Sequence, residues 1–359
     1  MAERRILVTG AGGFIGARVV EILHAAGIGQ VKAGLRRWSS GARVGRLAVE
    51  LVQCDIRDPR QVRDALRGVS HVVHCAVSGT ERETIVEGTR VLLQGALDAG
   101  VRKVVHLSTV DVYGTPQGEV TETQPFGSTG RMYGEAKIAA EQAAQALAAR
   151  GLPVAILRPA LVHGPFGATF TIAYAQRLQA RPWLVPEPAA QGTCNLVYVD
   201  DLVGAIVAAL DADIRPGEAF NINGPERPSW HQYFHALNHA LGLPPLVAAS
   251  PRRSQLAATL MEPVRAGAKL VLRGLKPQIM AVYQRSELAR RVMKDAEARI
   301  RSTPSPYELA AFGRRVSYSS EKARRVLGYS PCFPMSEALP LTAAWLHASG
   351  FVDARRLAA

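Results

Sequence analysis

The chain has 359 residues, of which 48% are hydrophobic and 20% charged, and its formal net charge is +13. This size suffices for one large core, or for a large domain with a smaller companion. No apolar run approaches the ~20 residues of a membrane-spanning helix, and no signal peptide precedes the first strand-like segment. The four cysteines lie far apart, without a CxxC pair or a histidine at metal spacing. This pattern argues against disulfides and a metal site, and it predicts a soluble, cytoplasmic protein with reduced thiols.

The positive charge is concentrated in one region. Residues 251–301 hold twelve Lys or Arg against four Asp or Glu. No nucleic-acid recognition motif accompanies this excess, so we expect no nucleic-acid partner. Apolar residues recur here at roughly helical spacing, which predicts a basic amphipathic insert. Three interpretations stay open: packing on a small domain with a solvated basic face, a lid over a pocket, and peripheral contact with an anionic membrane.

The N-terminal segment predicts a buried strand over residues 4–9, a glycine-rich loop, and a helix over residues 17–26. This order is typical of the phosphate-binding start of a dinucleotide fold. Gly10 permits the tight turn, Gly13 lets the backbone approach a pyrophosphate, and Gly16 lets the helix pack on the strand. We expect five residues of the loop to bind the cofactor: Gly10, Gly13, Phe14, Ile15 and Gly16.

The second predicted strand, residues 31–35, ends at two arginines. In a dinucleotide fold the residue after this strand meets the adenosine ribose, where an acid holds the 2′-hydroxyl and an arginine accepts a 2′-phosphate. The sequence offers Arg36 and Arg37, with Arg43 nearby, and no acid. NADP is therefore favoured as cofactor and NAD is left open. The alternative is that these arginines only decorate a surface loop.

Strands and helices continue to alternate along the first half of the chain, which predicts a Rossmann-like, doubly wound parallel sheet of the α/β class. After the third strand, Asp55 and Ile56 are placed to touch the adenine. At the end of the fourth strand, Cys75 and Ala76 should pass beneath the ribose and nicotinamide.

Two polar stretches follow. The residues from Ser108 to Gly114 come directly after the fifth strand, at the edge of the sheet where ligands bind. Tyr133 and Lys137 lie four apart on a predicted helix and so project from one face. A lysine ammonium favours the phenolate, so we expect Lys137 to lower the pKa of Tyr133 from about 10 toward neutral. That tyrosine could then serve as an acid or base.

Matching motifs in one order extend over most of the chain: Thr9–Gly16, Cys54–Arg57, Val86–Thr89, Ser108–Gly114, Tyr133–Lys137 with Glu141, Leu157–Pro165, Val197–Leu202, Phe220–Gly224 and Lys322–Tyr329. With them the chain resembles the extended short-chain dehydrogenases/reductases, the NAD-dependent epimerase/dehydratase group. The resemblance implies that Tyr133 is the catalytic acid/base, that Lys137 binds the nicotinamide ribose, and that Thr109 orients the substrate oxygen. It also implies that Ser108, Arg158 and Pro159 contact the cofactor.

The chain departs from the family at positions that bear on the substrate. Sugar 4,6-dehydratases carry an Asp-Glu pair after the Thr, but here Val110 cannot donate a proton, so 4,6-dehydration is disfavoured. Asp111 is left as a base or a structural loop residue. Cys194 stands where sugar-nucleotide enzymes often have an arginine that grips the diphosphate. This loss favours less charged substrates, such as hydroxysteroids. His163 is a third candidate substrate contact.

We expect residues 1–165, with strands contributed by about 195–224, to form the NAD(P)-binding domain. Residues 166–195 and 225–359 should form a smaller, mostly helical substrate-binding domain. The first hypothesis is an NAD(P)-dependent oxidoreductase that moves a hydride between nicotinamide and a secondary alcohol or ketone carbon. The alternatives are a sugar-nucleotide epimerase with tightly held cofactor and a non-catalytic nucleotide-binding scaffold. A homodimer is left open.

Overall fold

The computed structural model describes residues 4–352 apart from 78–80, 180–182, 184, 248, 266 and most of 268–302. The chain divides into two units. The first comprises Met1–Val162, Asn195–Pro225 and Ser317–Phe333, and the second comprises His163–Cys194, Glu226–Val316 and Pro334–Ala359.

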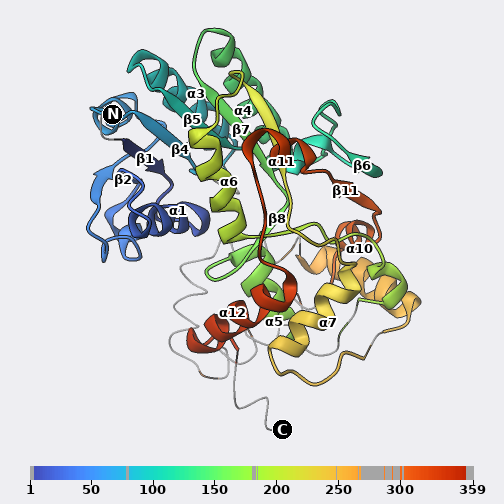
Figure 1. The fold of residues 1–359 in the computed structure, drawn as a ribbon. Helices are drawn as coiled ribbons and strands as arrows, with labels where there is room; N and C mark the ends of the chain where they lie inside the picture. The colour runs from blue at the N-terminus through green and yellow to red at the C-terminus, as the bar shows by residue number, and fades with distance from the viewer. Residues whose placement is uncertain are drawn as a thin grey trace. The chain divides into compact units, whose positions relative to one another are not determined.

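A parallel sheet forms the centre of the first unit, and it confirms the predicted doubly wound α/β fold (Figure 1). Within the described residues it has seven strands in the order β10-β7-β5-β4-β1-β2-β3. The strands are β1 (Arg5–Thr9), β2 (Gln30–Leu35), β3 (Glu50–Gln53), β4 (His71–His74), β5 (Lys103–Leu107), β7 (Val154–Pro159) and β10 (Glu218–Ile222). The order of strands reverses between β1 and β4. Ligands of such sheets bind in the crevice beyond the carboxyl ends of the strands at this switch point.

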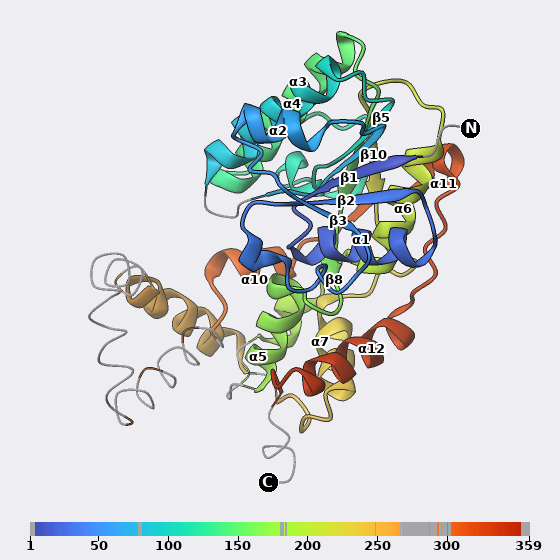
Figure 2. The ribbon, with the colours of Figure 1, turned by 90° about the vertical axis from the view of Figure 1, so that its left-hand side faces the viewer.

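Helices cover both faces of the sheet, as Figure 2 shows. One face carries α1 (Phe14–Ala25), α6 (Val199–Asp211) and α11 (Glu321–Leu327), and the other carries α2 (Pro59–Ala65), α3 (Arg82–Asp98) and α4 (Met132–Ala149). Side chains alternate between the two cores, because successive strand residues point to opposite faces. Val73 and Val105 are therefore buried against the α1 side, while Val72 and Val104 are buried against the α4 side.

The chain also forms several short elements. Two small sheets pair β6 (Gly118–Val120) with β11 (Val316–Tyr318), and β8 (Leu161–His163) with β9 (Leu196–Tyr198). Two short 3-10 helices, η1 (Trp38–Gly41) and η2 (Val110–Tyr113), follow β2 and β5.

Residues 317–333 belong to the first unit, although we expected them in the substrate domain. Two of their side chains form hydrogen bonds with the backbone of Asn223, just after β10, and this explains why the segment belongs to the first unit. The hydroxyl of Tyr329 donates to the carbonyl oxygen of Asn223 at 2.9 Å, and the Ser320 hydroxyl accepts from the Asn223 amide at 2.9 Å. The amide of Cys332 donates to the carboxylate of Asp201 at 2.7 Å. The paired residues lie far apart in the sequence, so no local pattern predicted these contacts.

The second unit is largely helical in its described part. It contains η3 (Ala168–Ile172), α5 (Ala173–Gln179), η4 (Glu187–Ala190), α7 (Trp230–Ala240), α10 (Pro306–Phe312) and α12 (Met335–Ala348). Its core is aromatic: the ring of Trp230 lies 5.9 Å from that of Tyr174 and 4.7 Å from that of Phe312. Large rings bury much apolar area and favour such tilted and edge-on contacts.

The basic insert predicted for residues 251–301 lies mostly outside the described residues. Its first part, residues 251–265, is helical. Ser254 and Ala258 are buried on one side, whereas Leu256, Leu260 and Val264 are 62%, 62% and 48% exposed. Of the helices described here, none combines the length and apolar character needed to cross a membrane.

Candidate functional site

The glycine loop packs too closely for side chains. Gly10 has a φ of +68°, and a Cβ there would lie 2.7 Å from the backbone of Ala76, just after β4. A Cβ on Gly16 would overlap the carbonyl oxygen of Gly10. Helix α1 begins directly after Gly13, with no side chain capping it and no acid in its first turn. Its first amide groups and positive dipole end therefore suit a phosphate, so this loop fits a dinucleotide.

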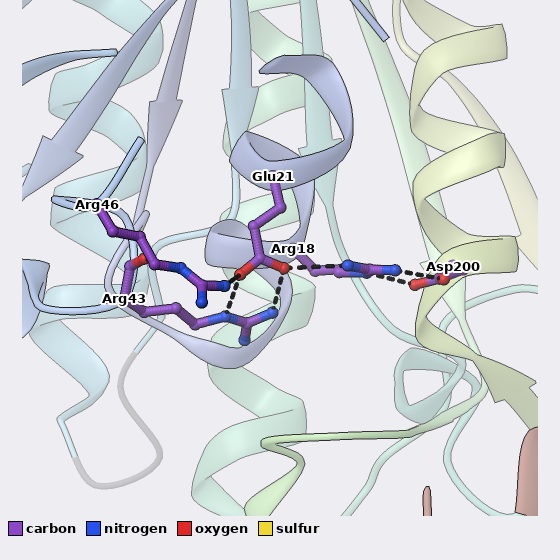
Figure 3. A network of polar contacts seen from close by, with 5 residues as sticks. All are labelled: Arg18, Glu21, Arg43, Arg46 and Asp200. Carbon is purple, nitrogen blue, oxygen red and sulfur yellow. Dashed lines mark hydrogen bonds and ion pairs between the residues drawn. The ribbon is translucent and has the colours of Figure 1, made fainter. Parts of the chain in front are cut away.

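A charged network connects α1 with residues 43–46 and with α6 (Figure 3). Glu21 accepts from Nε and Nη2 of Arg43 at 2.8 and 2.7 Å, and from Arg46 at 3.0 Å. Arg18 bridges Glu21 to Asp200, which it meets at 2.6 and 2.7 Å. Burial raises the pKa of Glu21 and is the largest effect, but the hydrogen bonds and charge of Arg43, together with the hydrogen bonds of Arg18 and Arg46, outweigh it and lower the pKa to about 2. This network thus engages Arg43, which we had placed near the ribose site.

The other ribose candidates lie beyond β2. Arg36 is half exposed, with Nη1 3.9 Å from a carboxylate oxygen of Glu81, and Arg37 is exposed. Asp55 holds Arg57 at 2.9 Å. The sequence did not reveal Glu81, because this acid comes from the start of α3, far along the chain. The carboxylate of Glu81 therefore lies near Arg36, at a position where the sequence predicted arginines and no acid.

Lys137 connects α4 to the sheet. It is 5% exposed, and its Nζ donates to the carbonyl oxygen of Leu107, the last residue of β5, at 2.7 Å. Burial lowers the pKa of Lys137 to about 8, against the opposing effects of Cys75 and Glu141. The ammonium therefore lies at the carboxyl end of β5, the edge of the sheet where the sequence predicted that ligands bind.

Tyr133 departs from the expectation about its acidity. Burial, together with the nearby charge of Asp111, raises the pKa of Tyr133 to about 12, and Arg131 opposes this. The expected lowering by Lys137 is therefore wrong for the free protein. The physical reason is that desolvation of the phenol outweighs nearby positive charge. The hydroxyl is neutral near pH 7.

Thr109 precedes η2, the short helix that contacts α4. Its Oγ1 accepts from the amide of Asp111 at 3.2 Å, which leaves its own proton to be donated. The carboxylate of Asp111 is paired with Nη2 of Arg131 at 2.6 Å. Asp111 thus joins η2 to the start of α4, a structural role beside the substrate role that the sequence suggested.

Two predicted cofactor residues, Ser108 and Arg158, form hydrogen bonds with a buried carboxylate, and their contact with a cofactor stays a prediction. The Ser108 hydroxyl donates to the carboxylate of Glu141 at 2.5 Å, and Arg158, which is 4% exposed, also binds Glu141. Their side chains are therefore engaged inside the protein. We had noted Glu141 only as part of a motif, and its spacing of four from Lys137 was the signal that could have identified it.

The remaining cofactor candidates lie at strand ends. Cys75 follows β4, and burial raises the pKa of its thiol to about 12, so it is neutral. Ile56 is buried against Gly88 of α3, where a Cβ would come within 2.6 Å of it. Pro159 ends β7 and lies opposite Ile222 of β10.

His163 and Cys194 are buried in the second unit. Burial lowers the pKa of His163 to about 4, and its ring meets that of Tyr233 edge-on. The Cys194 amide donates to the carbonyl oxygen of Pro228 at 2.8 Å. Contact of either residue with a substrate stays a prediction. Among the described residues, no three His, Cys, Asp or Glu side chains are grouped so that they could hold a metal ion.

Comparison with known proteins places this site in a family. The model of the NAD dependent epimerase/dehydratase family matches residues 6–223. A sterol demethylase protein B from Methylococcus capsulatus is 37% identical over 278 residues, covering 72% of this chain and 81% of that protein. The human 3 beta-hydroxysteroid dehydrogenase type 7 is 25% identical over 375 residues, covering 96% of this chain and 95% of that protein.

Among solved structures, a UDP-glucuronic acid 4-epimerase from Bacillus cereus in complex with NAD has the same fold. Its TM-score is 0.70 at 20% identity, with 98% of each chain covered. The parallel sheet, the glycine loop and the Tyr133–Lys137 spacing agree with these matches. The chain belongs to the NAD-dependent epimerase/dehydratase family.

Proposed function

We propose that the protein is an NAD(P)-dependent dehydrogenase that moves a hydride between nicotinamide and a secondary alcohol or ketone carbon of a sterol-like substrate. The arrangement of α4 carries this proposal: Tyr133 and Lys137 share one face, and Lys137 lies at the carboxyl end of β5. The names of two relatives, a sterol demethylase protein and a hydroxysteroid dehydrogenase, support a sterol-like substrate. Cys194, in place of a phosphate-gripping arginine, supports an uncharged one.

The chain's own groups handle the proton. A bound nicotinamide supplies or accepts the hydride. Tyr133 is neutral near pH 7, because burial raises its pKa to about 12, so it has a proton to give to a ketone oxygen. Thr109 donates a second hydrogen bond to that oxygen, since its Oγ1 already accepts from the Asp111 amide. The positive charge of Arg131 opposes the rise in the pKa of Tyr133, so it favours the phenolate that is left behind.

We propose NADP as the preferred cofactor and keep NAD as the alternative. Arg36 and Arg37, directly after β2, support NADP because a guanidinium pairs with a 2′-phosphate. Glu81, 3.9 Å from Arg36, is the observation that favours NAD, since a carboxylate can accept from a ribose hydroxyl. The NAD bound to the Bacillus cereus epimerase belongs to a protein only 20% identical.

The test compares two substrate classes with both cofactors. Purified protein is incubated with NAD or NADP and either a 3β-hydroxysteroid or UDP-glucose, and reduced nicotinamide is followed by absorbance. Net reduction with the steroid supports the proposal. Conversion of the UDP-sugar without net cofactor change supports the epimerase alternative. Cofactor binding without turnover of any secondary alcohol supports the scaffold. The Tyr133→Phe variant is the control for each activity.

We also propose that residues 251–265 contact anionic lipid. Leu256, Leu260 and Val264 recur every four residues, so they form one exposed apolar stripe on the helix. Arg252 and Arg253 are exposed at its start. Exposed leucines beside cations suit a helix that lies in a membrane interface, where a sterol-like substrate would be dissolved.

A further inference from the structure

A buried carboxylate on α4 lies one turn beyond Lys137. Tyr133, Lys137 and Glu141 are spaced by four and so project from the same helix face. Glu141 is 0% exposed. Its carboxylate accepts from the Ser108 hydroxyl at 2.5 Å, from Nε of Arg158 at 3.0 and 3.3 Å, and from Nη2 of Arg158. A charge this deeply buried needs such partners, because desolvation would otherwise disfavour it strongly.

Arg158 extends the contacts to the far end of η2. Its Nη1 donates to the hydroxyl of Tyr113 at 2.6 Å, and its guanidinium lies 4.9 Å from the centre of that ring. The Tyr113 hydroxyl donates in turn to Oδ1 of Asn221 at 2.7 Å. The segment from Ser108 to Tyr113 is therefore held at its first residue by Glu141, and at its last by Arg158 and Asn221.

Thr109 lies inside this held segment. The carbonyl oxygen of Leu107, one residue before the segment, accepts from Nζ of Lys137. Two successive residues at the end of β5 are thus bound to two successive turns of α4, through Lys137 and Glu141. This double connection fixes how far Thr109 can move along the helix that carries Tyr133.

We propose that Glu141, locked by Arg158, is the positioning residue of this site: it holds the Ser108–Tyr113 segment against α4 so that Thr109 and Tyr133 face the same substrate oxygen. The inference rests on the proposed function, which gives Thr109 and Tyr133 their roles. The side chains of Glu141 and Arg158 are buried and bonded to other groups of the protein, so their proposed effect is indirect. A small misplacement of such groups is enough to slow a reaction considerably.

Glu141 also acts on Lys137 through its charge. The groups that face Lys137 are His74 and Cys75 from the end of β4, His106 from β5, and Glu141 from α4 itself. Burial raises the pKa of the Cys75 thiol to about 12, and desolvation lowers the pKa of His74 to about 3, so both are neutral. Desolvation also lowers the pKa of His106. Glu141 is the carboxylate among these groups, and it raises the pKa of Lys137 beside the larger effect of Cys75.

The experiment separates position from charge. Glu141→Gln keeps the shape and the Ser108 contact but removes the charge, which leaves Arg158 unpaired. Glu141→Gln/Arg158→Met removes both charges and so leaves no buried unpaired cation. If the single variant does not fold, the double variant still tests the positioning role. Glu218→Gln is the matched control, since Glu218 pairs with Lys322 at 3.0 Å in the same unit.

Two readouts are used. The protein has seven lysines, so the pKa of Lys137 can be followed by NMR on protein with 13C at the lysine ε-carbon, the signal being assigned from its loss in Lys137→Met. This readout needs no substrate, and its failure is thus distinct from failure of the proposed function. The second readout is kcat with the alcohol that the functional test identifies, together with the Kd of the cofactor.

We expect the pKa of Lys137 to fall by about one unit in Glu141→Gln and to return close to its original value in the double variant. We expect kcat of the folded double variant to fall about tenfold or more, while the cofactor Kd is retained and Glu218→Gln changes neither. A folded double variant with unchanged kcat would overturn the positioning role. An unchanged Lys137 pKa in Glu141→Gln would overturn the role of its charge.

Discussion

The Nζ atom of Lys137 donates a 2.7 Å hydrogen bond to the carbonyl oxygen of Leu107. The bond connects α4 to the last residue of β5 and places a buried cation at the edge of the sheet where the site lies. Burial of this ammonium has an energetic cost, because desolvation disfavours its charged form. The Lys137 ammonium at the centre of the site therefore lowers the free energy of unfolding of the protein.

Lys137→Met should raise the free energy of unfolding near pH 7. The pKa of Lys137 is about 8 when folded, against about 10.4 in an unfolded chain. Below pH 8 the residue is charged in both states, so the folded state carries the desolvation cost, roughly 3 kcal/mol less the lost bond to Leu107. Above about pH 8 the folded protein loses this proton first, and the advantage of Met should vanish by about pH 10.5.

Urea unfolding of both proteins at several pH values checks this prediction. Other titrating groups are common to the two proteins and cancel in the difference. A gap between them that stays constant from pH 7 to about pH 10.5 would contradict the assigned cause.

Tyr133→Phe should abolish turnover while the cofactor still binds. The phenol is the group with a proton to give, since burial holds its pKa at about 12. Loss of a general acid slows a reaction by about 10²–10⁴-fold. Activity assays and cofactor titration of the same sample provide the measurement. Turnover equal to that of the parent protein would remove Tyr133 from the mechanism.

Arg36→Ala should weaken NADP about tenfold or more while NAD changes little, because a charge-assisted bond to the 2′-phosphate is lost. Arg43→Ala is the matched control. Arg43 is bound to Glu21 at 2.7 Å, so its loss should lower stability and affect both cofactors equally. Fluorescence titration with the two reduced cofactors gives the Kd values. Equal weakening of both by Arg36→Ala would count against NADP.

Gly16→Ala should prevent cofactor binding and destabilise the first unit, because its Cβ would overlap the carbonyl oxygen of Gly10. Gly204→Ala in α6 is the opposite case. Nothing lies within 4 Å of a Cβ at Gly204, so alanine should stabilise the helix by about 0.5–1 kcal/mol. Thermal unfolding and cofactor titration compare the two variants. A Gly16→Ala protein that binds cofactor normally would refute the close packing of the loop.

Leu256→Gln/Leu260→Gln should reduce binding to vesicles of phosphatidylserine and phosphatidylcholine about a hundredfold or more, since each buried leucine contributes about 1.5–3 kcal/mol. The control is Leu341→Gln, a leucine of α12 that is 51% exposed. Co-sedimentation with vesicles measures the difference. Failure of the parent protein to co-sediment would end the lipid proposal.

The local rules of the sequence predicted the fold well. Alternating strands and helices and a glycine loop with constrained spacing are short-range signals, so the sheet could be derived without knowledge of long-range contacts. The helix carrying Tyr133 and Lys137 was placed for the same reason. The assignment of residues 317–333 failed, because it depends on pairing with Asn223 and Asp201, which no local pattern encodes.

Side-chain partners were the other limit of the sequence. Arg43 and Arg158 are each bonded to a glutamate that the sequence did not indicate, and their place near a cofactor stays a prediction. Arginines of a sequence motif look alike whether they meet a ligand or a carboxylate, and only the fold brings the carboxylate near. The pKa of Tyr133 was misjudged similarly, since burial is a property of the folded chain.

The split composition of the first unit has a consequence for biosynthesis. Its final segment, residues 317–333, is translated almost a whole chain length after β1. Until that segment leaves the ribosome, the end of β10 lacks the partners that Tyr329 and Ser320 provide. The first unit therefore cannot complete these contacts until translation of the chain is nearly finished, so its folding ends late.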